Sequence, residues 1–458
     1  MARPHLFVSG FALALAGAPA HAQTCQPSWD TAAGNPGIAD GYVGPMFVFN
    51  GGAGGGDRLF AGGSFSALGG AAQTRGIAAW NPATAQWSGV GGGCYSTSTN
   101  YFLAGLGAYD FGAGNELVAG GSFATAGGVA ATTNLARWNG TRWTGVLGGQ
   151  PDGAVWAIAT FGGRLYVGGG FTHLGTTTAG GIASWQSDES WQPVGSGIGG
   201  GFSPNVFALR AYDDGSGLKL YAGGRFSSLG GVPGLIARWT GSAWQAVGGG
   251  VSAGNTFSDI EATAVFNDGS GNALYVGGWD LVPSGSPLCN VAKWDGGAWH
   301  AVGQYLGGRT TALAVFDDGS GAGPALYAGG TAQPSINYVA KLVAGQWVTL
   351  SGGVGQPGGP PFPSVFGLLT WNDRLYVGGT FQYVGTAQSA AHGFAAWHGC
   401  TSPPCPADFN HDGRVTIQDI FDFLTAWFGG SATADFNHVN GVTVQDIFDF
   451  LTAWFAGC

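Results

Sequence analysis

Short apolar runs that end in a pair of glycines recur along most of the chain. There are seven of them: RLFAGG (58–63), ELVAGG (116–121), RLYVGG (164–169), KLYAGG (219–224), ALYVGG (273–278), ALYAGG (325–330) and RLYVGG (374–379). Successive runs start 48 to 58 residues apart, which indicates an array of similar units. The mixture of small, β-branched and aromatic residues is typical of strands in a tightly packed sheet.

Each unit contains three further strand signals. The glycine pair is followed by a variable loop, a segment such as LIARW, a tight polar turn and a second Trp that leads into VGGG. A segment such as VFALRAY and a turn such as DDGSG then precede the next run. We therefore predict four short strands per unit, with the glycine pair allowing neighbouring backbones to approach closely. Such units repeated radially indicate a β-propeller, and the loops are too long and uneven for the alternative, a β-solenoid.

The last unit lacks its fourth strand. GFAAWHG (393–399) is followed by Cys400 and a Pro-rich stretch, whereas PSWDTAAGNPGIADGYVGPMFVFN (27–50) aligns with the fourth and first strands of another unit. The predicted fold is thus mainly β, a seven-bladed propeller whose N-terminal strand closes the last blade and removes its free edge. A Cys25–Cys400 disulfide would join the two ends. Cys94 and Cys289 lie in units that are not neighbours, and we expect buried free thiols there.

Residues 405–458 lose the glycine pattern and show helical periodicity. Ile417, Ile420, Phe421, Leu424, Trp427 and Phe428 form one apolar stripe. A loop of oxygen ligands at alternating positions precedes this helix, as Ca²⁺ requires. The predicted ligands of this first, tight site are Asp408, Asn410, Asp412, the backbone of Arg414, Thr416 and Asp419.

The segment is duplicated 27 residues later, but with Val439 and Asn440 where the first copy has Asp412 and Gly413. The second set of ligands is Asp435, Asn437, the backbone of Gly441, Thr443 and Asp446. It offers two carboxylates against three, because Val439 occupies the fifth position. We therefore predict a second Ca²⁺ site that is weak or empty.

Both parts of the chain resemble known families. AAWNPATAQW (78–87) and the glycine pairs are similar to kelch repeats and to extracellular propeller repeats of fungal cell-surface polarity proteins. The tail, with its CPADFN start and terminal Gly-Cys, resembles a type I dockerin, a small all-α EF-hand-like domain. That resemblance implies a cohesin-like or surface receptor, although the helices carry no Lys or Arg, unlike those of cellulosomal dockerins. It also implies a disulfide clasp between Cys405 and Cys458, and partner-reading residues Ile417, Gln418, Val444 and Gln445.

The N-terminal segment indicates the cellular compartment, and the overall charge argues against some classes of partner. Residues 1–22 read as a signal peptide ending at Ala20-His21-Ala22, so a secreted or surface-attached protein with disulfides is expected. The net charge is −10 with only 15 Lys+Arg, which argues against nucleic acid and anionic membranes as partners. No later segment is long and apolar enough to span a membrane. The predicted domains are 1–22 (signal peptide), 23–400 (propeller), 401–404 (linker) and 405–458 (dockerin-like domain).

Candidate chemistry in the propeller is sparse. The long loops between the second and third strands, and between units, define one face that could bind a glycan or protein ligand. Tyr95, Tyr101, Phe257, Tyr305 and Phe362 could stack on a ligand there, or simply pack their own loops. Asp259 and Glu261 are adjacent acidic residues for which a solvated loop is expected, with glycoside hydrolysis as the alternative. The DDGSG turns are expected to be hairpins rather than Ca²⁺ loops.

The sequence therefore favours a secreted, non-catalytic recognition or adhesion propeller that is anchored through a Ca²⁺-dependent, dockerin-like module. Two alternatives remain open. One is a tethered enzyme of polysaccharide degradation, and the other is a purely structural surface-layer protein.

Overall fold

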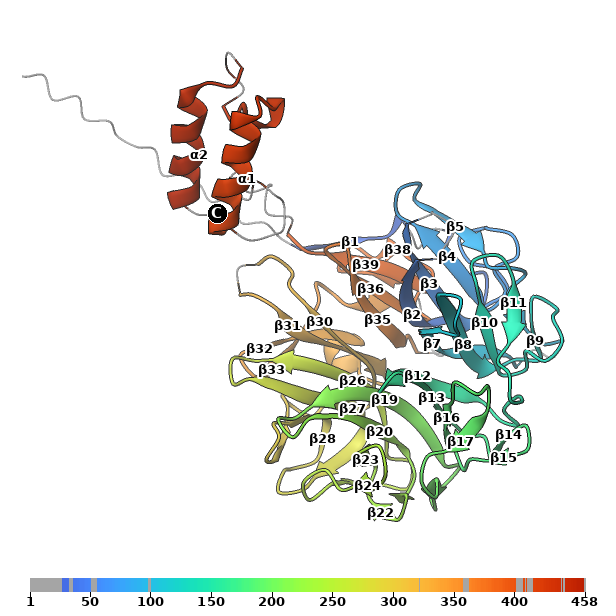
Figure 1. Cartoon of the computed structure of the whole chain (residues 1–458). Helices are drawn as coiled ribbons and strands as arrows, with labels where there is room; N and C mark the ends of the chain where they lie inside the picture. The colour runs from blue at the N-terminus through green and yellow to red at the C-terminus, as the bar shows by residue number, and fades with distance from the viewer. Residues whose placement is uncertain are drawn as a thin grey trace, which may run out of the picture. The chain divides into compact units, whose positions relative to one another are not determined.

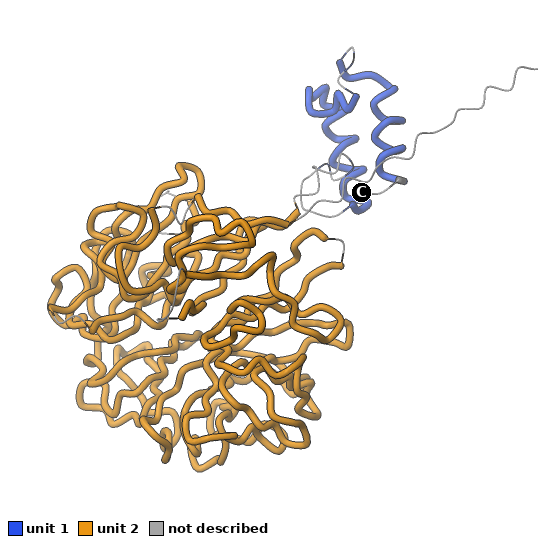
Figure 2. Tube along the Cα trace, turned by 180° about the vertical axis from the view of Figure 1, so that it is seen from behind, with its two compact units in different colours: residues 1–26, 402–458 blue, residues 27–401 orange. Residues whose placement is uncertain are grey.

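The chain forms two compact units, residues 27–401 and residues 402–458, the latter grouped with residues 1–26 (Figure 2). The computed structural model describes residues 27–32, 36–50, 56–97, 100–320, 322–356, 362–400, 407, 409, 415–437, 439 and 441–456. The predicted signal peptide and the predicted linker lie outside these ranges. No described helix is long and apolar enough to cross a membrane.

The main strands of the larger unit form five antiparallel sheets of four strands and one of nine. The nine-stranded sheet is counted here as two, sheets 5 and 6, so that seven sheets are numbered in chain order (Figure 1). Sheet 1 consists of β2 (Tyr42–Asn50), β3 (Asp57–Ser64), β4 (Ile77–Asn81) and β5 (Gln86–Gly89). Sheet 2 consists of β7 (Phe102–Asp110), β8 (Asn115–Ser122), β10 (Leu135–Trp138) and β11 (Trp143–Gly145). Sheet 3 consists of β12 (Val155–Phe161), β13 (Arg164–Gly169), β16 (Ile182–Trp185) and β17 (Trp191–Pro193). Sheets 4 and 5 consist of β19 (Asn205–Asp213), β20 (Leu218–Arg225), β23 (Ile236–Trp239) and β24 (Trp244–Gln245); and β26 (Asp259–Asn267), β27 (Asn272–Pro283), β28 (Cys289–Trp294) and β29 (Trp299–Ala301).

Sheet 6 comprises β30 (Arg309–Phe316), β31 (Ala325–Thr331), β32 (Val339–Val343) and β33 (Gln346–Thr349), and sheet 7 comprises β35 (Val365–Trp371), β36 (Arg374–Gly379), β39 (Phe394–His398) and β1 (Ser28–Asp30). A single bridge between Trp279 and Arg309 connects sheets 5 and 6. The loops carry short strands, namely β6 (Cys94–Tyr95), β9 (Thr125–Ala126), β14 (His173–Leu174), β15 (Thr177–Thr178), β18 (Ile198–Gly199), β21 (Ser228–Leu229), β22 (Val232–Pro233), β25 (Val251–Ala253), β34 (Val354–Gly355), β37 (Tyr383–Val384) and β38 (Ser389–Ala390), and one short 3-10 helix, η2 (Pro334–Ile336).

The first strands of the sheets contact one another in a cycle. β2 contacts β7, β7 contacts β12, and the series continues through β19, β26 and β30 to β35, which contacts β2 again. In Figure 1 the orange seventh sheet accordingly lies beside the blue first sheet. Seven apolar clusters fill the spaces between neighbouring sheets, so the core is distributed around the unit.

The glycine pairs have the role that the sequence predicted, close approach of neighbouring strands. In sheet 4, a Cβ on the first glycine, Gly223, would lie 2.7 Å from Cγ2 of Ile260 in the next sheet. A Cβ on Gly224 would overlap the carbonyl oxygen of Asn205 in the same sheet. The same arrangement holds in sheet 7, where Gly378 packs against Val43 of sheet 1. Any larger residue would therefore push the strands apart.

The spaced tryptophans form cross-strand pairs that also link the sheets. Trp138 and Trp143 are paired in register, with ring centroids 5.3 Å apart. The indole N–H of Trp143 donates to the carbonyl of Val90, the residue that follows β5 of sheet 1, at 2.9 Å. Equivalent bonds join Trp244 to Val194, Trp299 to Val247 and Trp347 to Val302.

The N-terminal strand completes sheet 7. β1 pairs antiparallel with β39, with Trp29 opposite Trp397. Asp30 accepts a hydrogen bond from Arg374 of β36, which adds an ion pair across the junction. Cys400 is disulfide-bonded, while Cys94 and Cys289 are free and buried. Cys25, the predicted partner of Cys400, lies outside the described residues, as do Cys405 and Cys458.

The smaller unit contains two helices, α1 (Ile417–Phe428) and α2 (Val444–Ala456), and a 3-10 turn η3 (Ala432–Ala434). Phe423 and Phe450 stack at its centre, with ring centroids 4.2 Å apart and planes at 4°. The indole of Trp427 donates to the Thr443 carbonyl at 2.7 Å, and that of Trp454 donates to the Thr416 carbonyl at 2.9 Å. This reciprocal pairing gives the duplicated halves matching environments.

The predicted apolar stripe of α1 is wrong in part. Ile420, Leu424 and Trp427 pack against the core, but Ile417, Phe421 and Phe428 are exposed, and the fully buried ring belongs to Phe423. Apolar residues cover more than half of the circumference of this helix, so periodicity alone did not show which of them face inward.

Candidate functional site

A β-bulge occurs at the same place in the first strand of every sheet. In sheet 4 the register shifts between Val206 and Ala208, so that Phe207 is the extra residue. The bulges are at Gly44-Pro45, Ala104, Trp156, Phe207, Glu261, Thr311 and Phe366. A bulge re-aims its side chain, and all of these residues line one pocket of about 460 Å³.

We call this the axial pocket. It lies where the first strands begin and the second strands end, the face from which the long loops emerge. Its lining residues are Tyr42, Gly44, Pro45, Leu103, Ala104, Trp156, Ser203, Asn205, Phe207, Arg225, Glu261, Arg309, Thr311, Thr331 and Phe366. All seven sheets contribute, and the volume lies within the range of ligand-binding pockets.

One side of the axial pocket is aromatic. Phe366 of sheet 7 contacts Tyr42 of sheet 1 at 4.9 Å between ring centroids. Trp156 of sheet 3 contacts Phe102 of sheet 2 at 4.8 Å and Phe207 of sheet 4 at 5.2 Å. Such contacts fix the rings in place and leave a largely apolar wall.

The other side carries charge. Oδ2 of the buried Asp259 lies 2.5 Å from a terminal nitrogen of Arg225 and 3.3 Å from one of Arg309. The second terminal nitrogen of Arg309 lies 3.2 Å from Oε1 of Glu261. The expectation that Asp259 and Glu261 lie in a solvated loop is therefore wrong. Both are on β26, which begins at Asp259. The alternating segment Asp-Ile-Glu-Ala is the start of this strand, but it directly follows a long loop, so the sequence pattern assigns it to the loop.

Burial controls the protonation of this cluster. Burial, followed by the negative charge of Asp259, raises the pKa of Glu261 to about 8. Burial also raises the pKa of Asp259, but both arginines contact this carboxylate and favour its charged form, so we assign the proton to Glu261. Oδ1 of Asp259 and the Nε–H groups of Arg225 and Arg309 are buried and have no hydrogen-bond partner among the described residues. Groups of this kind are concentrated at functional sites.

An aromatic ridge runs beside the charged side. The guanidinium of Arg309 lies 4.8 Å from the ring centroid of Trp279. Phe257 stacks nearly parallel to Trp279, with planes at 18°, and Phe202 meets Phe257 at 5.3 Å. Phe202 and Phe257 are both exposed.

The five aromatic residues that were predicted on this face have different roles. Phe257 belongs to the ridge, and Phe362 is exposed. The hydroxyl of Tyr305 donates to Asp280, and that of Tyr101 donates to the carbonyl of Phe65 at 2.9 Å. Tyr95 lies beneath the guanidinium of Arg75. Tyr95 and Tyr101 line a second pocket, distinct from the axial one.

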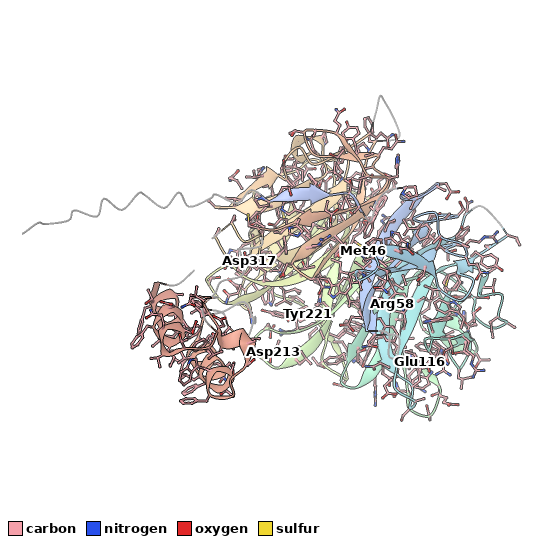
Figure 3. All side chains as sticks on the ribbon, turned by 90° about the horizontal axis from the view of Figure 1, so that it is seen from above. Met46, Arg58, Glu116, Asp213, Tyr221 and Asp317 are labelled. Carbon is pink, nitrogen blue, oxygen red and sulfur yellow. The ribbon has the colours of Figure 1, made fainter. Side chains whose placement is uncertain are left out.

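The DDGSG turns are hairpins, as the sequence predicted, and their second aspartate is structural. Asp214 accepts a hydrogen bond from the Tyr221 hydroxyl at 2.8 Å and pairs with Arg238 of β23. Asp268 and Asp318 make the equivalent contacts in sheets 5 and 6. Asp213 and Asp317, labelled in Figure 3, mark two of these turns, and the labelled Tyr221 lies on the strand that follows the first of them. Although burial opposes it, hydrogen bonding to Ser216 and Tyr221 lowers the pKa of Asp214 to about 2.

The first predicted Ca²⁺ loop is described only at its end. Asp408, Asn410, Asp412 and Arg414 lie outside the described residues. Thr416 caps α1 by accepting a hydrogen bond from the Gln418 N–H at 3.2 Å. Oδ2 of the buried Asp419 accepts one from the Thr416 N–H at 2.7 Å.

The second loop brings its oxygen atoms together. Oδ1 of Asp435 and Oδ1 of Asn437 both accept from the N–H of Val439, at 3.1 and 2.9 Å. Asp446 is buried and accepts from the N–H groups of Asn437 and Thr443. Gly441 has the left-handed φ of 71° that turns the chain. Two carboxylates and an amide oxygen fit the oxygen chemistry of Ca²⁺, and Val439, at the sequence position of Asp412 in the first copy, has no side-chain oxygen. No group of three or more acidic, His or Cys ligands occurs among the described residues.

The predicted partner-reading residues lie on exposed helix surfaces. Ile417, Phe421 and Phe428 share one face of α1, and Val444, Phe448 and Phe455 share the matching face of α2. The exposed fractions of these six residues are between 58% and 78%. Gln418 and Gln445 lie at the edge of these faces and donate to Asp422 and Asp449, both at 2.9 Å. We call the two surfaces the apolar helix faces.

Comparison with known proteins finds similarity only among solved structures. No protein-family model and no curated protein matches the sequence. The structure is similar to the extracellular domain of BT4673 from B. thetaiotaomicron, with 9% identity and a TM-score of 0.45, over 81% of this chain and 39% of that one. It is similar to the computationally designed protein Ika8 (14% identity, TM-score 0.42, 79% of this chain and 97% of that one) and to the V. cholerae biofilm matrix protein Bap1 (12%, 0.32, 66% and 55%). The kelch and dockerin resemblances remain predictions from the sequence.

Proposed function

We propose that this is a secreted, non-catalytic recognition protein in two parts. Residues 27–400 form a seven-bladed β-propeller that binds a ligand in the axial pocket. Residues 405–458 form a dockerin-like module that, with bound Ca²⁺, attaches the protein to a cohesin-like receptor on a surface or extracellular assembly. The observation that carries the proposal is the repeated exposure of large apolar residues on the two apolar helix faces.

The cyclic contacts of the first strands support the propeller. Each sheet packs against the next through its glycine pair, and sheet 7 packs against sheet 1 in the same way. Repetition about an axis brings the seven bulges to one place. A pocket in which every blade supplies a side chain is suited to binding rather than to stability alone.

The attachment role follows from the exposed apolar area. The three residues on each face are apolar and exposed, whereas Phe423 and Phe450 already fill the interior. Holding six such side chains in water lowers solubility without stabilising the unit, and exposed apolar faces of this kind are typical of interaction surfaces. Each apolar helix face begins directly after a predicted Ca²⁺ loop, at Ile417 and at Val444. Metal binding would therefore fix the position of the first residue of each face.

The test uses the full chain and an envelope-protein fraction of its source organism. We expect retention on immobilised protein in Ca²⁺ and release by a chelator. The double variant Phe421→Ser, Phe448→Ser should lose retention, whereas Thr425→Ser with Thr452→Ser, on the same helices, should keep it. The attachment role would be refuted if the Phe421→Ser, Phe448→Ser variant were retained as well as the native chain. It would also be refuted if the chelator did not release the native chain.

One observation supports a polysaccharide-degrading enzyme as a second candidate. Glu261 is a carboxyl group that keeps its proton near neutral pH, as a general acid does. Asp259 is a poor partner for it, because it is buried and engaged by two arginines, and no other carboxylate is among the residues that line the axial pocket. A hydrolase of this type needs two accessible carboxyl groups.

A further inference from the structure

We propose, building on the recognition role above, that the axial pocket binds the carboxylate-bearing sugar of an acidic polysaccharide. The carboxylate of a hexuronate unit would pair with Arg309 and Arg225. Its ring would lie against the aromatic side of the pocket, and the adjoining sugars would follow the aromatic ridge.

The net positive charge of the arginine cluster favours a negatively charged ligand. Arg225 and Arg309 are positive, and among the described residues Asp259 is the one fully buried carboxylate that pairs with them. With its proton in place, Glu261 adds no negative charge. The cluster therefore keeps one positive charge more than its own carboxylates neutralise, in a setting where water screens poorly.

The guanidinium groups that line the pocket suit a planar acceptor. A guanidinium has five N–H groups in a fixed fork that matches a carboxylate. Arg225 uses one terminal nitrogen on Asp259, and its side chain lines the pocket. Arg309 is held in place by Asp259, Glu261 and the ring of Trp279, so its fork is already oriented before a ligand arrives.

The aromatic surfaces favour a sugar over a simple carboxylate. Phe366, Tyr42 and Trp156 give the pocket wall flat apolar faces, and Asn205, Thr311 and Thr331 add hydrogen-bonding groups. The C–H face of a pyranose packs on aromatic rings while its hydroxyls bond to polar side chains. The exposed ridge of Phe202, Phe257 and Trp279 extends this surface beyond the pocket, which fits a polymer rather than a free monosaccharide.

The ionisable groups on or directly behind the pocket wall predict the pH response. These are Tyr42, Arg225, Asp259, Glu261 and Arg309. Tyr42 has its pKa raised to about 12 by burial and stays neutral. As the pH rises through about 8, Glu261 ionises and cancels the excess positive charge. Affinity for a carboxylate should therefore fall between pH 7 and 9.

The experiment is calorimetric titration of the full chain with tetrasaccharides of galacturonate, glucuronate, mannuronate and guluronate, each beside a neutral hexose tetrasaccharide. We expect at least one uronate to bind and its neutral counterpart to bind at least about tenfold more weakly. Arg309→Gln should weaken binding by about 30-fold, as loss of one partner in a buried charged contact does. Arg309→Lys should retain part of the affinity. Arg142→Gln, at an exposed turn, is the matched control.

Glu261→Gln separates the readings of the pocket. A glutamine imitates the protonated acid, so the variant should bind the uronate at pH 7 and lose the decline toward pH 9. Turnover of the bound sugar by the native chain, abolished in this variant, would overturn the binding role in favour of hydrolysis. Thermal unfolding of each variant shows whether a lost affinity reflects a lost fold.

Besides such turnover, three results would overturn the inference. These are no binding of any uronate, equal binding of acidic and neutral sugars, and equal, Arg309-dependent binding of a hexaglutamate peptide. None of them affects Ca²⁺-dependent attachment, which is measured on the same preparations. Failure of this inference is therefore distinguishable from failure of the proposed function.

Discussion

Trp29 and Trp397 lie edge to face where the two ends of the larger unit meet, with ring centroids 5.2 Å apart and planes at 68°. The contact reproduces the Trp pair of other sheets, for example Trp80 with Trp87 at 5.4 Å. In sheet 7 the third and fourth strands therefore come from opposite ends of the unit, whereas in other sheets one hairpin supplies both. The stability of sheet 7 thus depends on the N-terminal segment.

Trp29→Ala should lower the free energy of unfolding by about 2 kcal/mol. The side chain is only partly buried, so the cost is below the 3–5 kcal/mol or so of a fully buried Trp. Chemical denaturation measures this difference. Ser28→Ala, on the exposed side of the same strand, should change stability by less than about 0.5 kcal/mol. A Trp29→Ala protein as stable as the Ser28→Ala protein would contradict the closure of sheet 7 by β1.

The two glycines of a pair should differ in their sensitivity to substitution. Gly223→Ala meets the Ile260 side chain, which can shift, and should cost about 1–3 kcal/mol. Gly224→Ala meets a backbone carbonyl, which cannot shift without breaking β19–β20 pairing, and should cost more. Gly297→Ala, in an open turn, serves as the control. Equal losses at Gly223 and Gly224 would show that the pair is not a close-approach device.

Acid should destabilise the larger unit through the hairpin aspartates. The folded-state pKa of Asp214 is about 2, below the ordinary value near 4, so its contribution is present above pH 4 and lost as the pH falls toward 2. That contribution is on the order of 2 kcal/mol. Asp214→Asn should be less stable than the native chain at pH 7 and close to it at pH 2. A constant difference across this range, followed by denaturation at each pH, would contradict the assignment.

The sequence predicted most of the fold because each unit repeats the same signals. Seven glycine pairs, spaced tryptophans and a missing fourth strand were enough to place β1 beside β39. The bulges were not predicted, because the bulged residues differ in type, as Ala104, Trp156 and Glu261 do. They have in common only their position in the first strand of each sheet. Which sheet supplies the charged residues is likewise visible only in three dimensions, since Arg225, Asp259 and Arg309 are far apart along the chain.

Ca²⁺ affinity should differ between the two loops of the tail. Val439 contributes no carboxylate at the fifth position, so calorimetry should find one tight site and one weak or empty site. Val439→Asp restores the missing ligand and should tighten the second site by at least about tenfold. Val442→Ile, in the same loop, should leave it unchanged. Two equal, tight sites in the native chain would refute the difference.

Separate loss of the two activities tests the central claim, which is that the larger unit recognises a ligand and the smaller unit attaches the protein. Arg309→Gln and the double variant Phe421→Ser, Phe448→Ser are each assayed for uronate binding and for Ca²⁺-dependent retention on envelope protein. We predict that Arg309→Gln loses ligand and keeps retention, and that the double variant shows the reverse. A variant that loses both functions while folded, or two variants that lose neither, would contradict the account.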